Sequence, residues 1–264
     1  MAKALYDGVS GVARKVKKKY DGVSGVARKV KKAYDGVSGV ARQYWSTGTP
    51  LSSLAVGSTV YMKVDGVSTA FLVVNQGRPS SAYDSSCDGT WLLMKDCYES
   101  RVWDSSNNDY RNSDVHSYLN NTFVNLFDSD IKSVIKQVTI PYTKGTGSSG
   151  SLAKGTNGLS AKIFLISYYE AGFAGIDPNV NAEGMALDYF YFDDASDPKL
   201  VANLNGSAVY WWLRSPNTNN TTTAWRVGSR GGVTAKSVTT SGGIRPCLIL
   251  PSTQTVDESF NIVA

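Results

Sequence analysis

The chain has 264 residues, of which 42% are hydrophobic and 11% aromatic, so its composition is that of a globular protein with a sizeable core. Glycine is abundant and helix-forming runs are scarce, which favours a strand-rich, turn-rich fold. No run reaches the roughly 18 apolar residues that a membrane span requires, and the first residues lack the apolar core of a signal peptide. We therefore expect a protein made in the cytoplasm, without a signal peptide and without membrane insertion.

The net charge of +5 is divided unevenly along the chain. Residues 1–45 hold eleven Lys or Arg and three Asp, a balance of +8. Residues 46–264 hold sixteen basic and nineteen acidic residues, a balance of −3. This asymmetry predicts two parts with different partners, an appendage over residues 1–45 and a main domain over residues 46–264.

The three cysteines are Cys87, Cys97 and Cys247, an odd number without the spacing of a metal site. A disulfide framework and a zinc site are therefore both disfavoured. Reduced, partly buried thiols are the favoured interpretation, and a Cys87–Cys97 pair in an oxidising setting is the alternative.

A repeat of 14 residues opens the chain, with copies that begin at Tyr6, Tyr20 and Tyr34. Each copy contains Asp-Gly and Ser-Gly, which supply turn chemistry, followed by residues that alternate with period two. The pattern predicts strand and turn, and one such strand has too little apolar area to be stable without neighbours. The lysines could bind nucleic acid, but no base-stacking aromatics accompany them, so a solvated face that protects strand edges is favoured and no nucleic-acid partner is expected.

These repeats resemble the Tyr-x-Gly-Val-x-Gly-x-Ala-Arg-Lys repeats near the N-termini of tail-associated proteins of bacteriophages and prophages, over about residues 4–44. The resemblance implies that residues 1–45 attach the protein to phage tail or baseplate proteins and that it is found in the virion. Because one repeat strand needs neighbours, we also expect a homo-oligomer, for which a trimer is the assembly suggested by analogy.

The main domain begins with a predicted hairpin. Residues 58–64 and 67–75 alternate around Asp65 and Gly66, a strong hairpin signal. Residues 91–94 form the next predicted strand, which is short and buried, and residues 161–167 form a later one.

Two helices are predicted between these buried strands. Residues 110–127 carry apolar side chains at helical spacing, and Ser113 can cap the N-terminus of this helix. A second, shorter helix is predicted over residues 128–136. His116, the only histidine, has no nucleophile or carboxylate in a motif with it, so we interpret it as structural.

Acidic side chains cluster in residues 168–205 and could hold calcium. No EF-hand spacing is present, and an ordinary acidic loop is the favoured interpretation. The residues concerned are Asp177, Asp188, Asp193, Asp194 and Asp197.

Two core-like strands bracket a polar tract between residues 208 and 251. Trp211 and Trp212 are neighbours in a strand, so they face its opposite sides, one in the core and one covered by a loop. Arg214 and Arg245 end the bracketing strands, where a buried arginine needs a carboxylate or carbonyl partner. We interpret these four residues as a structural frame.

A second resemblance rests on four motifs in order: residues 110–123, residues 162–167 with Glu170, residues 211–216, and residues 243–246. Together these resemble a large bacterial and phage domain family related to the C-type-lectin-like fold of formylglycine-generating enzymes and of variable proteins made by diversity-generating retroelements. The resemblance covers about residues 50–251. It implies an α+β fold with mixed antiparallel sheets and two short helices, preceded by the β-repeat appendage.

In the variable proteins of this fold, the hypervariable positions lie before the closing strand and display a ligand surface, which here maps to residues 217–241. The predicted anchors within the tract are Val227, Val233 and Val238. The candidate ligand-binding residues are Asn217, Asn219, Asn220, Trp225, Arg226, Ser229, Arg230, Thr234, Lys236 and Ser237. The alternative is a plain polar hairpin.

The enzymes of the related family need a reactive cysteine pair. Here Cys247 lies in a hydrophobic strand, far along the chain from Cys87 and Cys97, so we expect neither an enzyme nor a cofactor. The hypothesis from sequence is a receptor-binding adhesin of a phage tail that displays a variable surface to a protein or glycan on a bacterial cell. The alternatives are a structural tail or baseplate decoration protein and, less favoured, a formylglycine-generating-type enzyme.

Overall fold

The structure is a computed structural model of the chain, and it describes residues 48–145, 151–174, 180–191 and 198–264 together with the backbone of six strands among residues 1–47. Within the described residues, most regular structure is strand, and two α-helices and eight short 3-10 helices complete it. The predicted α+β class is confirmed. No helix in this part of the chain is both long and apolar enough to cross a membrane.

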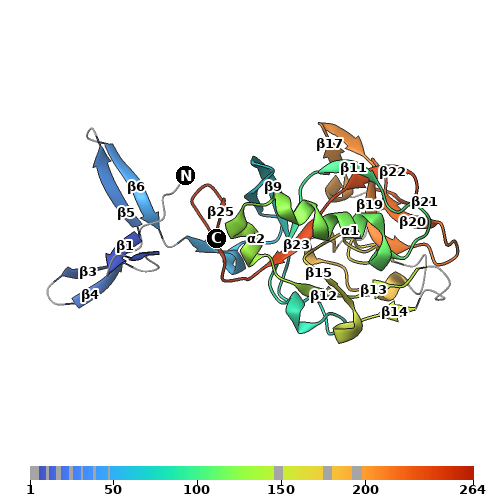
Figure 1. Cartoon of the computed structure of the whole chain (residues 1–264), viewed down its shortest axis with the longest axis horizontal. Helices are drawn as coiled ribbons and strands as arrows, with labels where there is room; N and C mark the ends of the chain where they lie inside the picture. Colours follow the sequence, from blue (N-terminus) through green and yellow to red (C-terminus); the bar gives the residue numbers. More distant parts are fainter. Residues whose placement is uncertain are drawn as a thin grey trace.

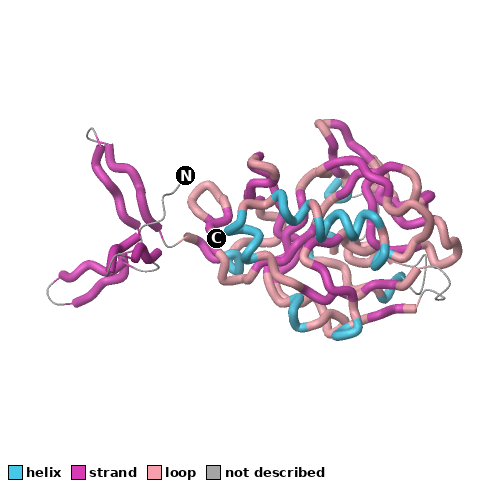
Figure 2. Tube along the Cα trace, viewed as in Figure 1, coloured by secondary structure: helices cyan, strands magenta, loops and turns pink. Residues whose placement is uncertain are grey.

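The N-terminal repeats form three antiparallel hairpins (Figures 1 and 2). Asp7 pairs in register with Arg14, and the equivalent residues of the other two copies pair in the same way. The prediction of strands is therefore confirmed. The strands are β1 (Tyr6–Val9), β2 (Val12–Lys15), β3 (Lys19–Val23), β4 (Val26–Val30), β5 (Lys32–Val37) and β6 (Val40–Ser46).

The Asp-Gly dipeptides lie inside β1, β3 and β5, so the prediction that they form turns is wrong. Val9 pairs with Val12, which leaves a two-residue connection, the length that favours a tight hairpin. The Ser-Gly dipeptides predicted as turns occupy these connections, which lie outside the described residues.

Two five-stranded sheets make up most of the main domain within the described residues. The first has the order β16-β23-β10-β9-β8 and the second the order β11-β22-β19-β20-β21, and all their pairs are antiparallel except β19 with β22. The strands of the first sheet are β8 (Thr59–Val64), β9 (Val67–Gln76), β10 (Thr90–Met94), β16 (Ile163–Phe164) and β23 (Cys247–Leu250). Those of the second are β11 (Glu99–Val102), β19 (Trp211–Pro216), β20 (Thr223–Val227), β21 (Val233–Ser237) and β22 (Ser241–Ile244).

Smaller sheets complete the domain. β12 (Val138–Ile140) pairs with β15 (Leu159–Ala161), β13 (Tyr142–Thr143) with β14 (Leu152–Ala153), and β17 (Ala202–Leu204) with β18 (Ser207–Val209). β24 (Thr255–Val256) lies between β7 (Thr49–Pro50) and β25 (Ile262–Val263), so the beginning and the end of the main domain are joined in one sheet.

The predicted hairpin is confirmed as β8 and β9. Asp65 and Gly66 both have positive φ, of 51° and 73°, which is the backbone that a two-residue hairpin turn of this twist requires. Glycine adopts this conformation without steric cost, and aspartate is among the residues that tolerate it.

The first predicted helix is wrong in length. Ser113 has an extended backbone and its hydroxyl accepts from the His116 N–H, so it caps a helix that starts at Asp114 and ends at Asn121. The rest of residues 110–127 forms separate 3-10 turns on either side. The second predicted helix is confirmed with shorter ends. These elements are η3 (Tyr110–Asn112), α1 (Asp114–Asn121), η4 (Phe123–Leu126) and α2 (Ser129–Val134).

The remaining 3-10 helices lie in the loops between these elements. They are η1 (Leu51–Ser53), η2 (Ser85–Cys87), η5 (Gly155–Asn157), η6 (Val180–Ala182), η7 (Asp188–Phe190) and η8 (Pro198–Leu200). η6 and η7 lie in the described segment 180–191, and α1 contacts β16 at the edge of the first sheet.

The core runs between the sheets and includes four fully buried tryptophans, Trp91, Trp103, Trp211 and Trp212. Trp211 donates its indole N–H to the Leu200 carbonyl, at the end of η8, and Trp212 donates to the Arg101 carbonyl on β11. Each buried indole is therefore satisfied by a backbone oxygen. The strand predicted over 161–167 is split into β15 and β16, but its apolar residues are buried.

Candidate functional site

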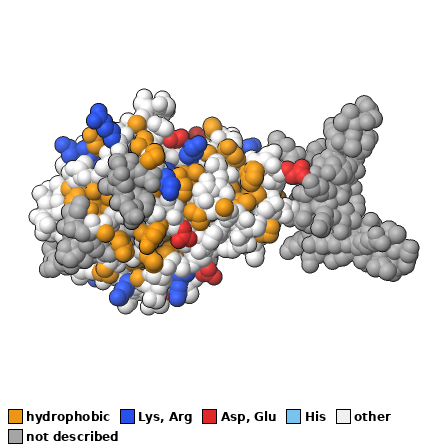
Figure 3. Space-filling view, turned by 180° about the vertical axis from the view of Figure 1, so that it is seen from behind, with side chains coloured by type: hydrophobic (Ala, Val, Ile, Leu, Met, Phe, Trp, Pro, Cys, Tyr) orange, Lys and Arg blue, Asp and Glu red, His pale blue; other side chains and the backbone are white. Residues whose placement is uncertain are grey.

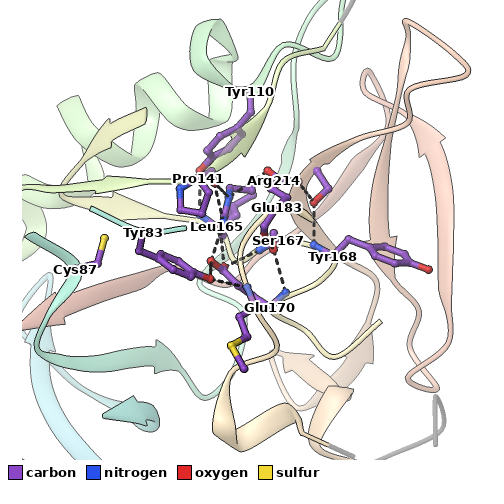
Figure 4. A network of polar contacts seen from close by, with 12 residues as sticks. Tyr83, Cys87, Tyr110, Pro141, Leu165, Ser167, Tyr168, Glu170, Glu183 and Arg214 are labelled. Atoms are coloured by element: carbon purple, nitrogen blue, oxygen red, sulfur yellow. Dashed lines mark hydrogen bonds and ion pairs between the residues drawn. The ribbon is translucent and has the colours of Figure 1, made fainter. Parts of the chain in front are cut away.

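A buried ion cluster fixes the strand from which the polar tract departs (Figure 4). Arg214 on β19 is fully buried and makes two hydrogen bonds to Glu170, at 2.5 and 2.7 Å from the Oε2 and Oε1 atoms. The Arg214 Nε lies 3.3 Å from the Glu183 Oε1. Two backbone carbonyls, of Pro141 and Leu165, also accept from the guanidinium. The predicted partners of Arg214 are therefore confirmed, both carboxylate and carbonyl.

The cluster extends to side chains from other parts of the chain. The Tyr83 hydroxyl donates to the Glu170 Oε1 at 2.8 Å, and the Ser215 hydroxyl donates to the Glu183 Oε2. The Ser167 hydroxyl donates to the Glu183 carbonyl and the Ser167 N–H donates to Glu170. The cluster therefore ties residues 167–170 and the described segment 180–191 to β19.

Burial sets the charge of this cluster. Two carboxyl groups face one guanidinium, and burial raises the pKa of Glu183 to about 7, although Arg214 and the Ser215 hydroxyl lower it. Burial and the nearby Glu170 also raise the pKa of Tyr83 well above its usual value. The charged side chains Arg214, Glu170 and Glu183 have no solvent exposure, so a ligand cannot reach them. The cluster is a clamp rather than a reaction centre.

Arg245 is the second predicted clamp. It follows β22, is buried, and donates from Nε to the Met94 carbonyl at 2.8 Å, with its guanidinium 5.1 Å from the Trp211 ring centroid. Burial lowers the pKa of Arg245. Arg245 therefore has a carbonyl as the partner that a buried arginine is expected to need.

All three cysteines are free and buried. Burial raises the pKa values of Cys87 and Cys97 to about 12 and that of Cys247 well above its usual value. Since the thiolate is the nucleophilic form, these thiols are poorly suited to attack a substrate near neutral pH.

A third clamp, Asn108, holds the loop that begins the polar tract. Asn108 is buried, and its Nδ2 lies 2.9 Å from each of the carbonyl oxygens of Asn217, Asn220 and Thr223. The Asn108 N–H also donates to the Thr221 carbonyl. One side chain therefore ties together the backbone of residues 217–223.

The candidate ligand-binding residues lie on this loop, on β20 and β21, and on the turn between them. Exposed are Asn219, Asn220, Arg230, Thr234 and Lys236, and half-buried are Asn217, Trp225, Arg226, Ser229 and Ser237. The anchors Val227 and Val238 are fully buried, as predicted, and Val233 packs half-buried against the core.

Two of these candidates are not the freely exposed side chains that the sequence predicts. The Trp225 ring lies 5.2 Å from the Tyr168 ring, which places it partly against the core. The Arg226 guanidinium lies 4.0 Å above the Tyr210 ring and 6.0 Å from the Trp212 ring. The alternation of the strands explains this, because Arg226 pairs in register with Trp212 and with Thr234, on one face of the sheet.

Tyr210 is a functional candidate that the sequence predictions omit. Tyr210 is 44% exposed, and the guanidinium of Arg226 stacks on its ring. The nearest signal in the sequence is its place two residues before Trp212, which puts both rings on the same face.

On the back of the molecule, Figure 3 shows hydrophobic and basic side chains interspersed over the domain.

The sequence predictions also omit a polar groove of about 590 Å³ beside α1 and α2. Asn120, Asn125, Lys132 and Lys162 are among its lining residues. The Asn120 side chain is part of the fold, because its Nδ2 donates to the Ile163 carbonyl and its Oδ1 accepts from the Ile163 N–H. His116 also lines the groove, and burial lowers its pKa to about 4, so it is neutral at physiological pH.

The calcium alternative falls mostly outside the described residues. Asp177, Asp193, Asp194 and Asp197 lie in segments that the structure does not describe, and Asp188 is exposed. Within the described ranges, no group of three His, Cys, Asp or Glu side chains is arranged to hold a metal ion.

A comparison with protein families gives one finding for this domain. The model of a family described as a domain of unknown function, DUF6273, matches residues 88–252. This range includes Arg214, Arg245, Asn108 and the whole polar tract. No curated protein and no solved structure matches the chain.

Proposed function

The chain belongs to the DUF6273 family, a domain of unknown function, and we propose that it is a receptor-binding protein that presents residues 217–241 to a ligand on a bacterial surface. Residues 1–45 attach it to a phage tail or a similar particle, so its location is the virion. Binding takes place at the end of the domain formed by β19, β20 and β21, and requires no cofactor.

One observation carries this proposal: a polar tract with exposed side chains is attached to a strand and a loop that buried side chains hold in place. The ion cluster around Arg214 holds β19, and Asn108 holds the loop that follows it. A recognition surface gains affinity when its backbone is fixed before the ligand arrives, because less conformational entropy is lost on binding. Polar side chains on such a base can vary without disturbing the core.

The architecture agrees with a C-type-lectin-like fold, which we propose for the main domain. It combines antiparallel sheets with two short helices, and β7 and β24 join its two ends. The polar tract departs from β19 and returns at β22, which lies next to β19 in the same sheet. A loop excursion of this kind, based on neighbouring strands, is suited to display.

The three N-terminal hairpins support attachment to a particle. Each copy pairs in the same register, and an isolated two-stranded hairpin is marginally stable in water. The hairpins therefore gain stability from packing against sister chains or a tail protein. Many copies on one particle would convert weak single contacts into firm adsorption.

Two other functions remain candidates for the same architecture. A structural decoration protein of the tail or baseplate would need the hairpins but no ligand. A formylglycine-generating-type enzyme would need a reactive cysteine, and the raised pKa values of Cys87, Cys97 and Cys247 argue against that activity.

A binding experiment on whole bacterial cells tests the proposal. The fluorescently labelled full chain is applied to a panel of strains, beside a variant with Asn219→Ala, Arg230→Ala and Lys236→Ala, all three exposed in the tract. A matched control carries Asn157→Ala, Lys154→Ala and Lys95→Ala, which are exposed elsewhere on the domain.

We expect the wild-type chain and the control to bind the same strains and the tract variant to lose most of that binding. Equal binding by the tract variant would exclude residues 217–241 as the recognition surface. Binding to none of the strains, with particle assembly dependent on residues 6–44, would favour the decoration protein.

A further inference from the structure

The stacked pair of Tyr210 and Arg226 has the features of a binding site for an anionic group. Arg226 lies on β20 with its guanidinium 4.0 Å above the Tyr210 ring. Its Nε is buried without a hydrogen-bond partner among the described residues. An aromatic ring therefore holds in place a planar donor group whose Nε has no partner among the described residues.

Three other arginines of the domain have acidic partners, whereas the fully buried Arg245 donates to a backbone carbonyl. Arg214 pairs with Glu170 and Glu183, Arg101 pairs with Glu99, and Arg111 pairs with Asp109. For Arg226 no acidic partner occurs in the part of the chain that the structure describes, and burial accordingly lowers its pKa. An arginine that is partly desolvated without a counter-charge is stabilised when an anion binds to it.

The segment of sequence that carries this pair is also free of negative charge. No Asp or Glu occurs in the sequence between Asp197 and Asp257. Arg230, on the turn after β20, and Lys236, on β21, are both exposed. The domain of residues 46–264 has a balance of −3, so the absence of acids from this stretch is a local property and not a consequence of composition.

The turn beside the pair supplies shape rather than extra donors. A Cβ added at Gly228 would lie 3.4 Å from the Tyr210 Cε1, so the turn packs against the ring. The Gly228 N–H donates to the Gly232 carbonyl, and the Gly231 N–H donates to the Gly228 carbonyl. These amides are engaged within the turn and do not form the cradle of N–H groups that typical phosphate sites use.

We propose that Tyr210 and Arg226 bind the carboxylate of an acidic sugar unit in a bacterial surface polysaccharide. This inference rests on the proposed function and names its ligand class. The planar fork of Arg226 matches a carboxylate with two parallel hydrogen bonds. The exposed part of the Tyr210 ring offers an apolar edge to the sugar, and Thr234, opposite Arg226 on β21, offers a hydroxyl.

Binding of defined polymers to the full chain tests this inference. Polygalacturonate presents carboxylates on sugars, poly(glycerol phosphate) presents phosphates, dextran is neutral, and duplex DNA is a polyanion without sugar carboxylates. The variants are Arg226→Gln and Arg226→Lys, with Lys154→Gln as a control that removes one exposed charge elsewhere. Circular dichroism and thermal unfolding check that each variant is folded.

We expect the wild-type chain and Lys154→Gln to bind polygalacturonate in preference to the other three polymers. Both Arg226 variants lose about tenfold or more in affinity, because glutamine removes the charge and lysine removes the planar fork. The binding weakens as salt is added, since the contact is partly exposed.

Three results would overturn the inference: unchanged binding of polygalacturonate by Arg226→Gln, full affinity in Arg226→Lys, or tighter binding of poly(glycerol phosphate) or DNA than of polygalacturonate. The cell-binding experiment separates this failure from that of the proposed function. A chain that binds cells through residues 217–241 but keeps full binding in Arg226→Gln retains the function and loses only this ligand.

Discussion

The buried ion cluster of Glu183 and Arg214 affects both the packing of this domain and the way its stability depends on pH. Arg214 has two carboxyl partners, so one negative charge is in excess when both are ionised. Glu183 faces Arg214, Glu170, Ser215 and the backbone of Thr143, and its side chain has no exposure. Burial raises the pKa of Glu183 to about 7, and the charge of Glu170 adds to this rise, although Arg214, Ser215 and the Thr143 backbone lower the pKa.

This raised pKa predicts a stability that falls as pH rises. Between the ordinary glutamate pKa of 4.5 and the folded pKa of about 7, the folded state holds a proton on Glu183 that the unfolded state has lost. The contribution of Glu183 to stability is therefore full below pH 4.5 and declines up to about pH 7, by on the order of 3 kcal/mol. Glu183→Gln, which keeps the shape and cannot titrate, removes this decline.

Urea unfolding of both proteins at pH 5 and pH 7.5 measures the effect. The wild-type protein should lose more stability between the two pH values than Glu183→Gln does, whatever the other groups contribute, because those groups are common to both. The same pH dependence in both proteins would show that Glu183 does not titrate in this range.

At the residue scale, the sequence could predict which arginines are clamps but not which carboxylates they meet. Arg214 and Arg245 end core strands, so their burial and their need for partners follow from local pattern. Glu183 and Tyr83 come from loops far from Arg214 in sequence, and only the packed fold brings them together. Tyr210 was similarly hidden, because its role depends on the register of β19 with β20.

At the scale of elements, the polar tract is a loop, a hairpin of β20 and β21, and a turn, each held by a different device. The loop depends on Asn108, the hairpin on its buried valines, and the turn on the hydrogen bonds of Gly228. Asn108 lies between η3 and β11, so the element that fixes the tract is more than a hundred residues away from it in sequence. No local pattern can predict such a contact.

Replacing Asn108 should therefore release the loop without unfolding the domain. Asn108→Ala leaves the carbonyl oxygens of Asn217, Asn220 and Thr223 without their shared donor, at a cost of about 1–3 kcal/mol. Hydrogen exchange should accelerate in residues 217–223 and remain slow in β23. Asn219→Ala, an exposed change in the same loop, should alter neither. Unchanged exchange in Asn108→Ala would mean that the loop is fixed by other contacts.

The predictions that rest on neighbouring residues are confirmed, whereas the prediction of one continuous helix over residues 110–127 is wrong. The hairpin at Asp65 and Gly66 and the cap at Ser113 follow from residues next to each other in sequence. The helix over 110–127 was overextended, because its apolar spacing continues through the cap at Ser113 and past Asn121. The Ser113 cap sets the start of α1, and the chain continues as the 3-10 helix η4 after α1 ends at Asn121.

At the scale of the whole molecule, the two parts of the chain differ in net charge and in architecture. The repeats carry a balance of +8 and form hairpins, whereas the main domain carries −3 but lacks acids between Asp197 and Asp257. We propose that Arg226, Arg230 and Lys236 attract anionic ligands to the tract, because opposite charges raise the rate of encounter. The appendage and the tract can thus serve attachment and recognition separately.

The central claim is that residues 217–241 meet the ligand while the frame beneath them stays unchanged. Hydrogen exchange of the full chain, with and without envelope polysaccharide from a strain that it binds, tests this claim directly. The account predicts new protection in peptides covering residues 210–241 and unchanged exchange in β10 and β23. Protection confined to the groove beside α1 and α2, or to the N-terminal hairpins, would contradict it.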